Sequence, residues 1–404
     1  MSIPNTERLL LANRVPPAPG EKRRVLVVDD EPGMRYMARR VLSRRFEVSE
    51  AGTAEEGLEL LETGTFHLAV VDVRLPGASG LELLTAIKTC CVGIDVIVMT
   101  GSAADPDEAL EDAVRRQAFF FLRKPFPMTV LETLAERAAE RQELEERVAN
   151  HVRVLEQNLE SARVFQERLL PPRRWKGPRI EIASYYAASE RLSGDFFDYW
   201  RLPDGGSALF IADVMGHGAS AAMITGIVKS QVRSLSSEIT DPGSVLYALE
   251  EELAKVRIGS FLTALLVFDH PAEGELLYCG AGHPPALALL PGETIVRLES
   301  TGVPINTGLP LAARETGSIA RRPDLRLLLL TDGYGEAAGP DGSRFDEADL
   351  AGSSPFDRAV HDALSAPLPE EGLRRLEASW TGFVAGGAGE DDRAAVLARL
   401  LPAS

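Results

Sequence analysis

Aspartates that follow strand-like runs form the first group of residues with chemical potential in this 404-residue chain. Residues 25–28 (VLVV) are an apolar run of strand length that leads into Asp29 and Asp30. A second such run, residues 68–71, ends at Asp72. Loops after parallel strands share one edge of a sheet, and three carboxylates there repel one another unless a cation lies among them. Because Mg²⁺ prefers oxygen ligands, these three aspartates are predicted to bind it.

Two further strand ends bring a hydroxyl and an ammonium group to the same predicted edge. Thr100 follows the apolar run 96–99, and Lys124 follows the run 119–122. A hydroxyl, an ammonium group and Mg²⁺ together can hold a phosphoryl group on a carboxylate, because they stabilise its oxygens electrostatically. The spacing therefore predicts that Asp72 accepts a phosphoryl group.

A second set of acidic motifs lies far apart in the carboxyl-terminal half of the chain. The motifs are residues 193–198 (SGDFFD), 212–218 (ADVMGHG), 331–333 (TDG) and 390–392 (EDD). Three of them follow apolar runs or lie beside glycines, which allow backbone to approach an ion or a substrate closely. Carboxylates assembled from distant strand ends can hold two metal ions, which ionise a bridging water and clamp a phosphoryl group during in-line attack.

The elements that position the first set alternate between strand and helix. Apolar runs and helical patterns alternate from Arg24 to about Val130, which predicts an α/β domain with a doubly wound parallel sheet of five strands. From about Pro178 to Leu401, many short strand candidates occur with a few separate helices. That pattern predicts an α+β domain, a β-sandwich flanked by helices.

Residues 131–170 contain no Gly or Pro and are rich in Glu and Arg, which predicts one long helix. An apolar series with alternating steps of four and three residues follows the period of a coiled coil. Its members are Val148, Val152, Leu155, Leu159, Ala162, Gln166 and Leu169. The pattern favours a helix that pairs with a second copy, and the alternative is a single surface helix packed on one domain.

Charge and cysteine content exclude several classes of partner and compartment. Lys and Arg number 43 and Asp and Glu number 60, which gives a net charge of −17. Without a basic stripe such a chain repels phosphate backbones, so no nucleic-acid partner is expected. No apolar run approaches the ~18 residues of a membrane helix. Cys90, Cys91 and Cys279 make a poor disulfide framework, so we expect a cytoplasmic protein.

The amino-terminal motifs resemble those of response-regulator receiver domains. The DDE run, VVDVRLPGASG, MTG and KPF stand in order within residues 24–130. The resemblance implies a sensor histidine kinase as partner and a role for each of six residues. These are the phospho-acceptor Asp72, the Mg²⁺ ligands Asp29 and Asp30, the switch hydroxyl Thr100, the phosphate-binding Lys124 and the rotating aromatic Phe121. A site that no longer receives phosphate is the alternative.

The carboxyl-terminal motifs resemble the PPM metal-dependent serine/threonine phosphatases, in particular their bacterial SpoIIE/RsbU-like branch. The resemblance covers nearly all of residues 165–400. Besides the four acidic motifs it includes Gln166 with the LLP of residues 169–171, Ala221 and Ala222, FLTALL, AGHPP (residues 281–285) and TDGYGE. Ala394 stands where the family usually has Thr, which removes a hydroxyl that can orient the site.

This second resemblance implies a site with two Mn²⁺ or Mg²⁺ ions. Its implied ligands are the carboxylates of Asp195, Asp213, Asp332 and Asp391 and the backbone carbonyl of Val214. Asp392 is either a neighbour of the ligands or an alternative ligand. His217 either protonates the leaving serine oxygen or only shapes its glycine loop, and His283 is expected to shape the fold.

We therefore expect residues 1–22 to be a flexible tail, 23–130 a receiver domain, 131–172 a helical coiled-coil linker and 173–404 a PPM-type phosphatase domain. The hypothesis is a cytoplasmic response regulator that dephosphorylates a phosphoserine or phosphothreonine, implied to lie on an anti-sigma-factor antagonist. The linker would transmit the receiver's state and would make a homodimer. The alternative function is a signalling scaffold whose phosphatase fold binds a partner without turnover.

Overall fold

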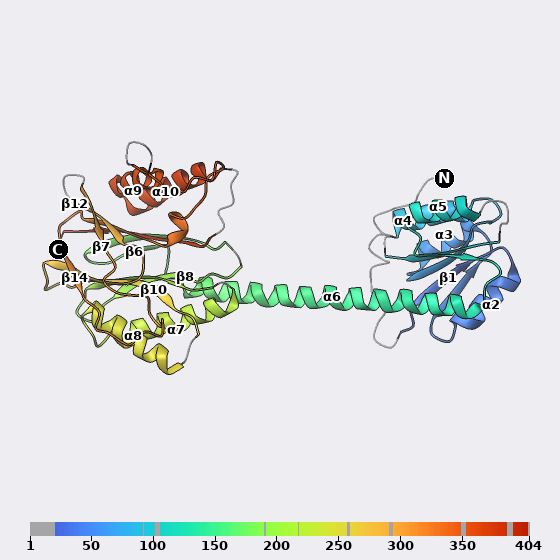
Figure 1. The fold of residues 1–404 in the computed structure, drawn as a ribbon, viewed down its shortest axis with the longest axis horizontal. Helices are drawn as coiled ribbons and strands as arrows, with labels where there is room; N and C mark the ends of the chain where they lie inside the picture. Colours follow the sequence, from blue (N-terminus) through green and yellow to red (C-terminus); the bar gives the residue numbers. More distant parts are fainter. Residues whose placement is uncertain are drawn as a thin grey trace. The chain divides into compact units, whose positions relative to one another are not determined.

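The computed structural model describes residues 21–91, 93–101, 106–189, 191–216, 218–256, 259–290, 294–348, 353–385 and 391–402. Most of the predicted tail at residues 1–22 thus lies outside the described residues. The chain divides into two compact units, Met1–Val154 and Leu155–Ser404 (Figure 1). The long helix α6 (Met128–Leu169) contributes residues to both.

The first unit is built on a five-stranded parallel sheet. Its strands are β1 (Arg24–Val28), β2 (Glu47–Ala51), β3 (Leu68–Asp72), β4 (Asp95–Thr100) and β5 (Phe120–Arg123), in the order β2-β1-β3-β4-β5. The helices are α2 (Pro32–Leu42), α3 (Ala54–Thr63), α4 (Gly80–Cys90), α5 (Pro106–Arg115) and the start of α6. Every residue of β3 and β4 is buried, as expected for strands covered on both faces. The predicted doubly wound α/β fold is confirmed.

The start of α6 is part of this first unit because its apolar face packs on the sheet. Leu131, Leu134, Ala135 and Ala138 are buried in one cluster with residues of β1, β3 and β4. The remaining part of α6 that reaches Val154 is mostly exposed and carries Glu and Arg in i,i+4 pairs such as Arg147–Glu143.

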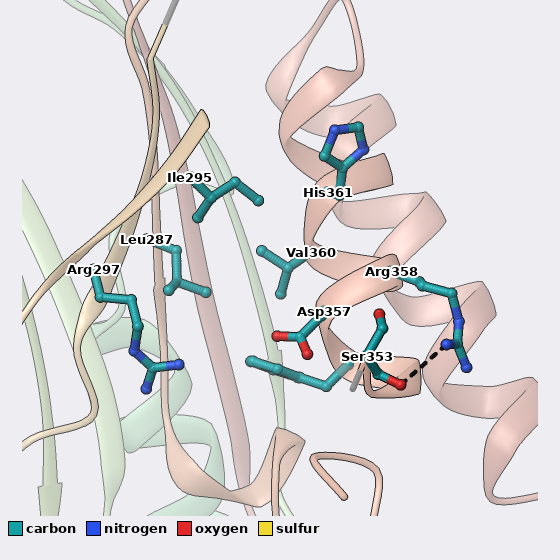
Figure 2. A pocket seen from close by; sticks show the side chains of 9 residues that line it. Leu287, Ile295, Arg297, Ser353, Asp357, Arg358, Val360 and His361 are labelled. Carbon is teal, nitrogen blue, oxygen red and sulfur yellow. Dashed lines mark hydrogen bonds between the residues drawn. The ribbon is translucent and has the colours of Figure 1, made fainter. Parts of the chain in front are cut away.

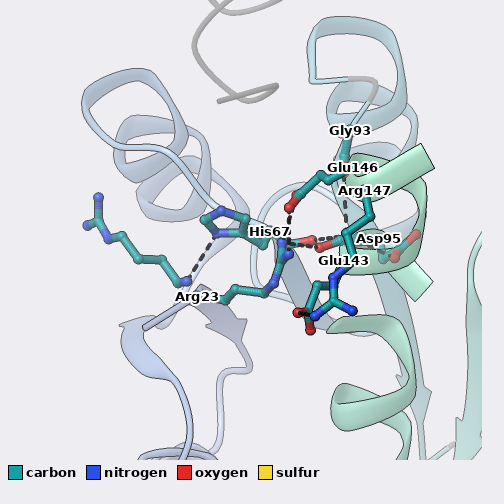
Figure 3. Close-up of polar contacts among 9 residues, drawn as sticks. Arg23, His67, Gly93, Asp95, Glu143, Glu146 and Arg147 are labelled. Carbon is teal, nitrogen blue, oxygen red and sulfur yellow. Dashed lines mark hydrogen bonds and ion pairs between the residues drawn. The ribbon is translucent and has the colours of Figure 1, made fainter. Parts of the chain in front are cut away.

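A polar network fastens α6 beyond this apolar contact, and Figure 3 shows several of its members. Asp95 accepts hydrogen bonds from Arg141, at 2.6 and 2.8 Å, and from Gln142, at 2.9 Å. Arg23 donates to Glu146 at 2.9 Å. Asp95 opens β4 and Arg23 immediately precedes β1, so the network lies at the amino ends of the strands, opposite the edge where Asp72 and Thr100 end theirs.

The second unit contains two antiparallel sheets. One has the order β14-β11-β10-β9-β8 and the other the order β13-β12-β15-β16-β7-β6. The strands are β6 (Arg174–Lys176), β7 (Ile180–Ala187), β8 (Asp195–Arg201), β9 (Ser207–Val214), β10 (Leu262–Asp269), β11 (Glu275–Ala281), β12 (Ala286–Leu290), β13 (Thr294–Leu298), β14 (Gly317–Ala320), β15 (Arg326–Leu330) and β16 (Arg393–Leu400). The helices are α7 (Ala219–Leu235), α8 (Pro242–Val256), η1 (Asp332–Tyr334), α9 (Pro355–Ser365) and α10 (Pro369–Phe383).

Apolar side chains from both sheets form the central core of this unit. Phe197 and Ile211 from the first sheet share a buried cluster with Ile182 and Val396 from the second. Helices α7 and α8 cover the outer face of the first sheet, and α9 and α10 cover that of the second (Figure 1). The α+β sandwich flanked by helices is confirmed. No helix among the described residues has the length and apolar character to cross a membrane.

Candidate functional site

Two buried carboxylates share one cation at the carboxyl edge of the parallel sheet. Lys124 Nζ lies 2.7 Å from Asp29 Oδ2 and 2.8 Å from Asp72 Oδ1. The second oxygen of each aspartate accepts a backbone N–H bond of 2.9 Å, from Glu31 to Asp29 and from Arg74 to Asp72. Lys124 and the backbone of Arg74 therefore hold the proposed phospho-acceptor in one orientation.

The electrostatic state of this first site follows from burial and from Lys124. Burial raises the pKa of Asp72, and the hydrogen bond from Lys124 only partly opposes this. Burial alone would lower the pKa of Lys124, but its hydrogen bonds to Asp29 and Asp72 raise it overall. Lys124 is therefore charged at neutral pH and compensates the two acids.

The other residues predicted for this site lie around Asp72 and Lys124. Thr100 is buried at the end of β4, the strand next to β3, and Asp30 is exposed after β1. Phe121 is half-buried on β5 and packs against the core beneath α3 and α4. The structure thus places Asp29, Asp72 and Lys124 in contact and Thr100, Asp30 and Phe121 at or near the same sheet edge.

In the second unit, Asp195 and Asp213 face each other on neighbouring strands. Asp195 opens β8 and is the direct partner of Asp213, near the end of β9. Like charges at directly opposed positions of an antiparallel pair destabilise it. Burial, followed by repulsion from Asp213, raises the pKa of Asp195 well above its usual range. Burial and repulsion from Asp332, Asp391 and Asp392 raise the pKa of Asp213 to about 7.

The second sheet brings the remaining acids to the same place. Asp332 follows β15, and Asp391 and Asp392 precede β16, which is the antiparallel neighbour of β15. Burial and then repulsion from Asp391 raise the pKa of Asp332. Both sheets of the sandwich thus supply carboxylates to one edge, and the charges that raise these three pKa values belong to other carboxylates.

Two glycines allow this close approach. A Cβ atom on Gly194 would lie 2.3 Å from the carbonyl oxygen of Val214, and one on Gly333 would lie 2.0 Å from that of Asp392. Any other residue at either position would push two segments of the site apart. Gly194 therefore allows the Val214 carbonyl to lie close to Asp195, the next residue. Gly333 likewise allows the 391–392 turn to lie close to Asp332, the residue before it.

Asp391 and Asp392 differ in their surroundings, which the sequence alone left open. Asp392 accepts hydrogen bonds from the N–H and the hydroxyl of Ser189, at 2.8 and 2.9 Å, and from the N–H of Gly194 at 3.2 Å. Asp391 is exposed. The contacts of Asp392 make it a support for the loop before Asp195, and they leave Asp391 as the better candidate ligand.

The donor set suits a hard divalent cation, although it is not preassembled. Among the residues that the structure describes, no group of three or more Asp, Glu, His or Cys side chains already stands in position to hold a metal ion. Burial and mutual repulsion nevertheless raise the pKa of Asp195, Asp213 and Asp332. A cation among them would offset both the burial of the charged carboxylates and their mutual repulsion. Hard divalent cations prefer carboxylate oxygens as ligands.

The sequence singled out two histidines, and the structure describes one of them. His217 lies outside the described residues. His283 is buried, its Nδ1 lies 2.8 Å from the hydroxyl of Thr263, and burial lowers its pKa to about 3. Since Thr263 is the strand partner of Asp213, the neutral His283 ring supports the strand next to the acids.

Two contacts of the acidic site come from residues that the sequence motifs included without a specific role. Thr331 donates a hydrogen bond to Asp195. Gln166, near the end of α6, donates to the carbonyl of Ser193 at 2.6 Å and accepts from its N–H at 3.2 Å. Gln166 is buried and so does not lie on a free coiled-coil seam, whereas Val148 is exposed. The spacing of four and three residues alone did not distinguish the two environments.

Comparison with known proteins matches both units. Residues 25–136 match the model of the response regulator receiver domain, and residues 203–401 match that of stage II sporulation protein E (SpoIIE). Phosphoserine phosphatase RsbP of Bacillus subtilis is 32% identical over 160 residues, 38% of this chain and 40% of RsbP. Transcriptional regulatory protein GlrR of Escherichia coli is 26% identical over 220 residues, 51% of this chain and 48% of GlrR.

The matched stretches cover less than half the length of either curated relative. Among solved structures, the SiaA-PP2C domain of Pseudomonas aeruginosa aligns with a TM-score of 0.52 and 21% identity, covering 62% of this chain and 99% of that domain. This likeness shows the fold of the second unit. Asp213, Asp332 and Asp391 lie within the SpoIIE match, and Asp195 precedes it.

Proposed function

Because the chain joins a response-regulator receiver domain to a SpoIIE-type domain of the PPM phosphatases, we propose that it is a response regulator whose output is phosphoprotein dephosphorylation. The substrate would be a phosphoserine or phosphothreonine on an anti-sigma-factor antagonist or a similar protein. The observation that carries the proposal is the convergence of carboxylates from both sheets, with raised pKa values, at one edge of the sandwich.

The proposed metal ligands are Asp195, Asp213, Asp332, Asp391 and the carbonyl of Val214. Two Mn²⁺ or Mg²⁺ ions held there would supply a water of lowered pKa and neutralise the charge of the phosphoryl group. The chain itself orients this donor set, since Thr331 holds one oxygen of Asp195. His217 would give a proton to the leaving serine or threonine oxygen.

In the receiver, Asp72 would accept a phosphoryl group from a sensor histidine kinase, with Mg²⁺ on Asp29, Asp30 and Asp72. Lys124 already contacts Asp72, so it is placed to bind a phosphoryl oxygen once the carboxylate is modified. Thr100 would then bond the phosphoryl group and Phe121 would change its position, as in other switches that order a segment around a phosphate.

We propose that α6 carries the change to the phosphatase. Two observations support this: the polar network of Asp95 with Arg141 and Gln142, and the paired bonds between Gln166 and Ser193. A homodimer would form along α6, where apolar side chains of the predicted series are exposed. These are Val148, Val152 and Leu155, with 62%, 50% and 59% of their surface accessible. Apolar stripes of this kind favour pairing of helices.

We also place the protein in the cytoplasm, as the poor disulfide framework suggests. Cys91 and Cys279 are both buried. Burial raises the pKa of the Cys279 thiol, which makes it a weak nucleophile. Both cysteines are therefore packing residues that suit a reducing compartment.

The test is Mn²⁺-dependent release of phosphate from p-nitrophenyl phosphate and from a phosphoserine peptide. The paired substitution of Asp213→Asn with Asp332→Asn should reduce both rates to background, and activity that survives it would exclude the metal mechanism. The scaffold alternative rests on Ala394, which stands where a hydroxyl is usual. It predicts no turnover with any divalent metal.

A further inference from the structure

A groove lies between the β12–β13 hairpin and the amino-terminal half of α9 (Figure 2). Its volume is about 590 Å³. One wall comes from the two strands and the other from α9 and the residue before its cap, and the lining comprises Leu287, Ile295, Arg297, Ser353, Phe356, Asp357, Arg358, Val360 and His361. We call this cavity the β13–α9 groove.

The β13–α9 groove continues into the acidic site. A second cavity of about 350 Å³ shares Leu287, Arg297, Phe356 and Asp357 with it. This second cavity is also lined by Thr331 and Asp332. A molecule whose phosphorylated residue lies at Asp332 can therefore extend along a continuous surface into the groove.

Apolar side chains from the sheet and from α9 line the floor of the groove. Ile295 and Arg297 are two residues apart on β13 and so share a face, and Leu287 is the strand partner of Arg297. Ile295 and Phe356 are half-buried. Leu287 and Val360 are buried, with 5% and 2% of their surface accessible. Figure 2 shows Leu287 and Ile295 facing Val360 across the cavity. The hollow is suited to an apolar side chain.

The charged groups that line the groove differ in the hydrogen bonds and ion pairs that they already make. Asp357 accepts bonds from the N–H and hydroxyl of Ser354 in the cap of α9. Arg358 donates to the carbonyl of Ser353. Arg297 contacts Glu299 at 3.2 Å, but both side chains are more than half exposed, at 57% and 68%, and such a pair is weak. Arg297 can therefore exchange Glu299 for a new acidic partner.

The position of β13 at the end of its sheet favours an extended polypeptide as the ligand of the groove. In its sheet, within the described residues, β13 is an end strand that pairs with β12. An end strand offers backbone groups to an incoming extended segment, and alternate side chains of that segment enter pockets on the sheet face. A small anion would use Arg297 alone and would leave the apolar floor uncovered.

The geometry points to a substrate-recognition role for the β13–α9 groove. We propose that it binds the segment that flanks the phosphorylated residue of the substrate protein, with an apolar side chain on Ile295 and Phe356 and an acidic side chain at Arg297. This inference rests on the proposed phosphatase function and adds to it a preference for acidic and apolar flanks.

The test compares two synthetic phosphoserine peptides with p-nitrophenyl phosphate. One peptide carries leucine and glutamate on both sides of the phosphoserine, and the other carries serine and lysine at those positions. Wild-type kcat/KM, divided by that for p-nitrophenyl phosphate, should be about tenfold higher for the first peptide. Arg297→Glu should reverse the preference, and Ile295→Asn should lower the ratio for the leucine peptide alone.

Arg322→Glu is the matched control, because it makes the same charge change at an exposed arginine between β14 and β15. It should leave the preference unchanged. Circular dichroism and a thermal melt establish folding, and Arg297→Gln is the second variant if charge reversal unfolds the chain. An Arg297→Glu enzyme that keeps the wild-type preference would overturn the proposal.

Peptide binding separates failure of this inference from failure of the proposed function. Fluorescence anisotropy of both peptides, labelled at one end, is measured with the wild type and with the variants in Mn²⁺. Selective binding without hydrolysis of any substrate would uphold the groove and refute the phosphatase. Hydrolysis of p-nitrophenyl phosphate without selective binding would uphold the phosphatase and refute the groove.

Discussion

The hydroxyl of Thr331 donates a hydrogen bond of 2.6 Å to Oδ2 of Asp195. Thr331 follows β15 and Asp195 opens β8, so this bond joins the two sheets at the edge where the acids converge. The same hydroxyl accepts a 2.9 Å bond from the backbone N–H of Ala394. A threonine hydroxyl thus orients an acid of the site even though position 394 has none.

Replacing Thr331 with valine should weaken metal binding without unfolding the domain. Valine keeps the shape of the side chain but leaves Asp195 without its donor and the Ala394 N–H without its acceptor. Loss of a group that orients a metal ligand typically lowers affinity, and we expect the apparent Kd for Mn²⁺ to rise roughly 10- to 100-fold. Titration calorimetry with Mn²⁺ measures this directly.

Thr331→Ser is the matched control for this prediction. Serine retains the hydroxyl and loses only the methyl group, so its Mn²⁺ affinity should stay near that of the wild type. If the valine variant binds Mn²⁺ as tightly as the serine variant, the Thr331 hydroxyl does not position the ligand.

Sequence reasoning predicted residue positions correctly where a single geometric rule of the fold determines them. Strands of a parallel sheet all end at one edge, so Asp29, Asp72 and Lys124 were expected close together, and the structure places Lys124 within 2.8 Å of both acids. The fold classes of both units were predicted from the alternation or segregation of strands and helices for the same reason.

Contacts that depend on the strand register could not be predicted from the sequence. In an antiparallel sandwich a shift of one residue changes every partner, so the opposition of Asp195 and Asp213 could not be derived from their motifs. The bonds of Gln166 to Ser193 likewise require the end of α6 to meet a loop 27 residues later. A glutamine in a helical series resembles a seam residue until its partner is known.

Gln166→Leu should uncouple α6 from the loop that precedes Asp195. Leucine is similar in size but can neither donate to the Ser193 carbonyl nor accept from its N–H, and these buried groups would lose their partners. We expect the free energy of unfolding of the second unit to fall by about 1–3 kcal/mol. Urea denaturation followed by tryptophan fluorescence measures that change.

The same variant should also lose its response to the receiver. With beryllofluoride on Asp72, the wild-type phosphatase rate should change, while that of Gln166→Leu should stay at one value. Gln157→Leu, on an earlier turn of α6, is the control and should respond like the wild type. A Gln166→Leu enzyme that responds fully to beryllofluoride would show that the signal does not pass through this contact.

Lys124→Ala should make the receiver more dependent on Mg²⁺. Removing Lys124 leaves Asp29 and Asp72 buried without their shared cation, which should cost about 3 kcal/mol in the absence of metal. Mg²⁺ would then replace the missing charge, so the rise in Tm on adding Mg²⁺ should be larger in the variant than in the wild type.

Lys88→Ala serves as the control for this Mg²⁺ effect. Lys88 is also partly buried, and it donates to the carbonyl of Ile94 rather than to an acid of the site. Its Mg²⁺-induced rise in Tm should equal that of the wild type. An equal rise in all three proteins would mean that Lys124 and Mg²⁺ do not compete for the same carboxylates.

The pair of His270 and Asp204 should make the stability of the second unit depend on pH. His270 Nδ1 lies 2.6 Å from Asp204 Oδ2. Burial alone would lower the pKa of His270, but its bonds to Asp204 and to the Thr240 carbonyl raise it overall. Burial would likewise raise the pKa of Asp204, yet the bonds from His270 and from the Gly206 N–H lower it.

The sign of the effect follows from these two directions. A raised histidine pKa stabilises the fold fully below the unfolded value of about 6.5, and that contribution is lost as the pH rises through the folded pKa. An aspartate whose pKa is lowered by folding stabilises the fold above about pH 4, and that contribution is lost as the pH falls through the pKa of the folded state. The pair therefore contributes most between about pH 4 and 6.5.

Asp204→Asn tests this directly, because asparagine keeps an oxygen for the Gly206 N–H but removes the charge. Relative to the wild type, the variant should be destabilised by about 0.5–1 kcal/mol at pH 5.5 and by clearly less at pH 8.5, since the pair is partly solvated. Urea denaturation at the two pH values measures the difference. In a His270→Asn background Asp204→Asn should show no such dependence on pH, and a dependence that persists there would assign the effect to other groups.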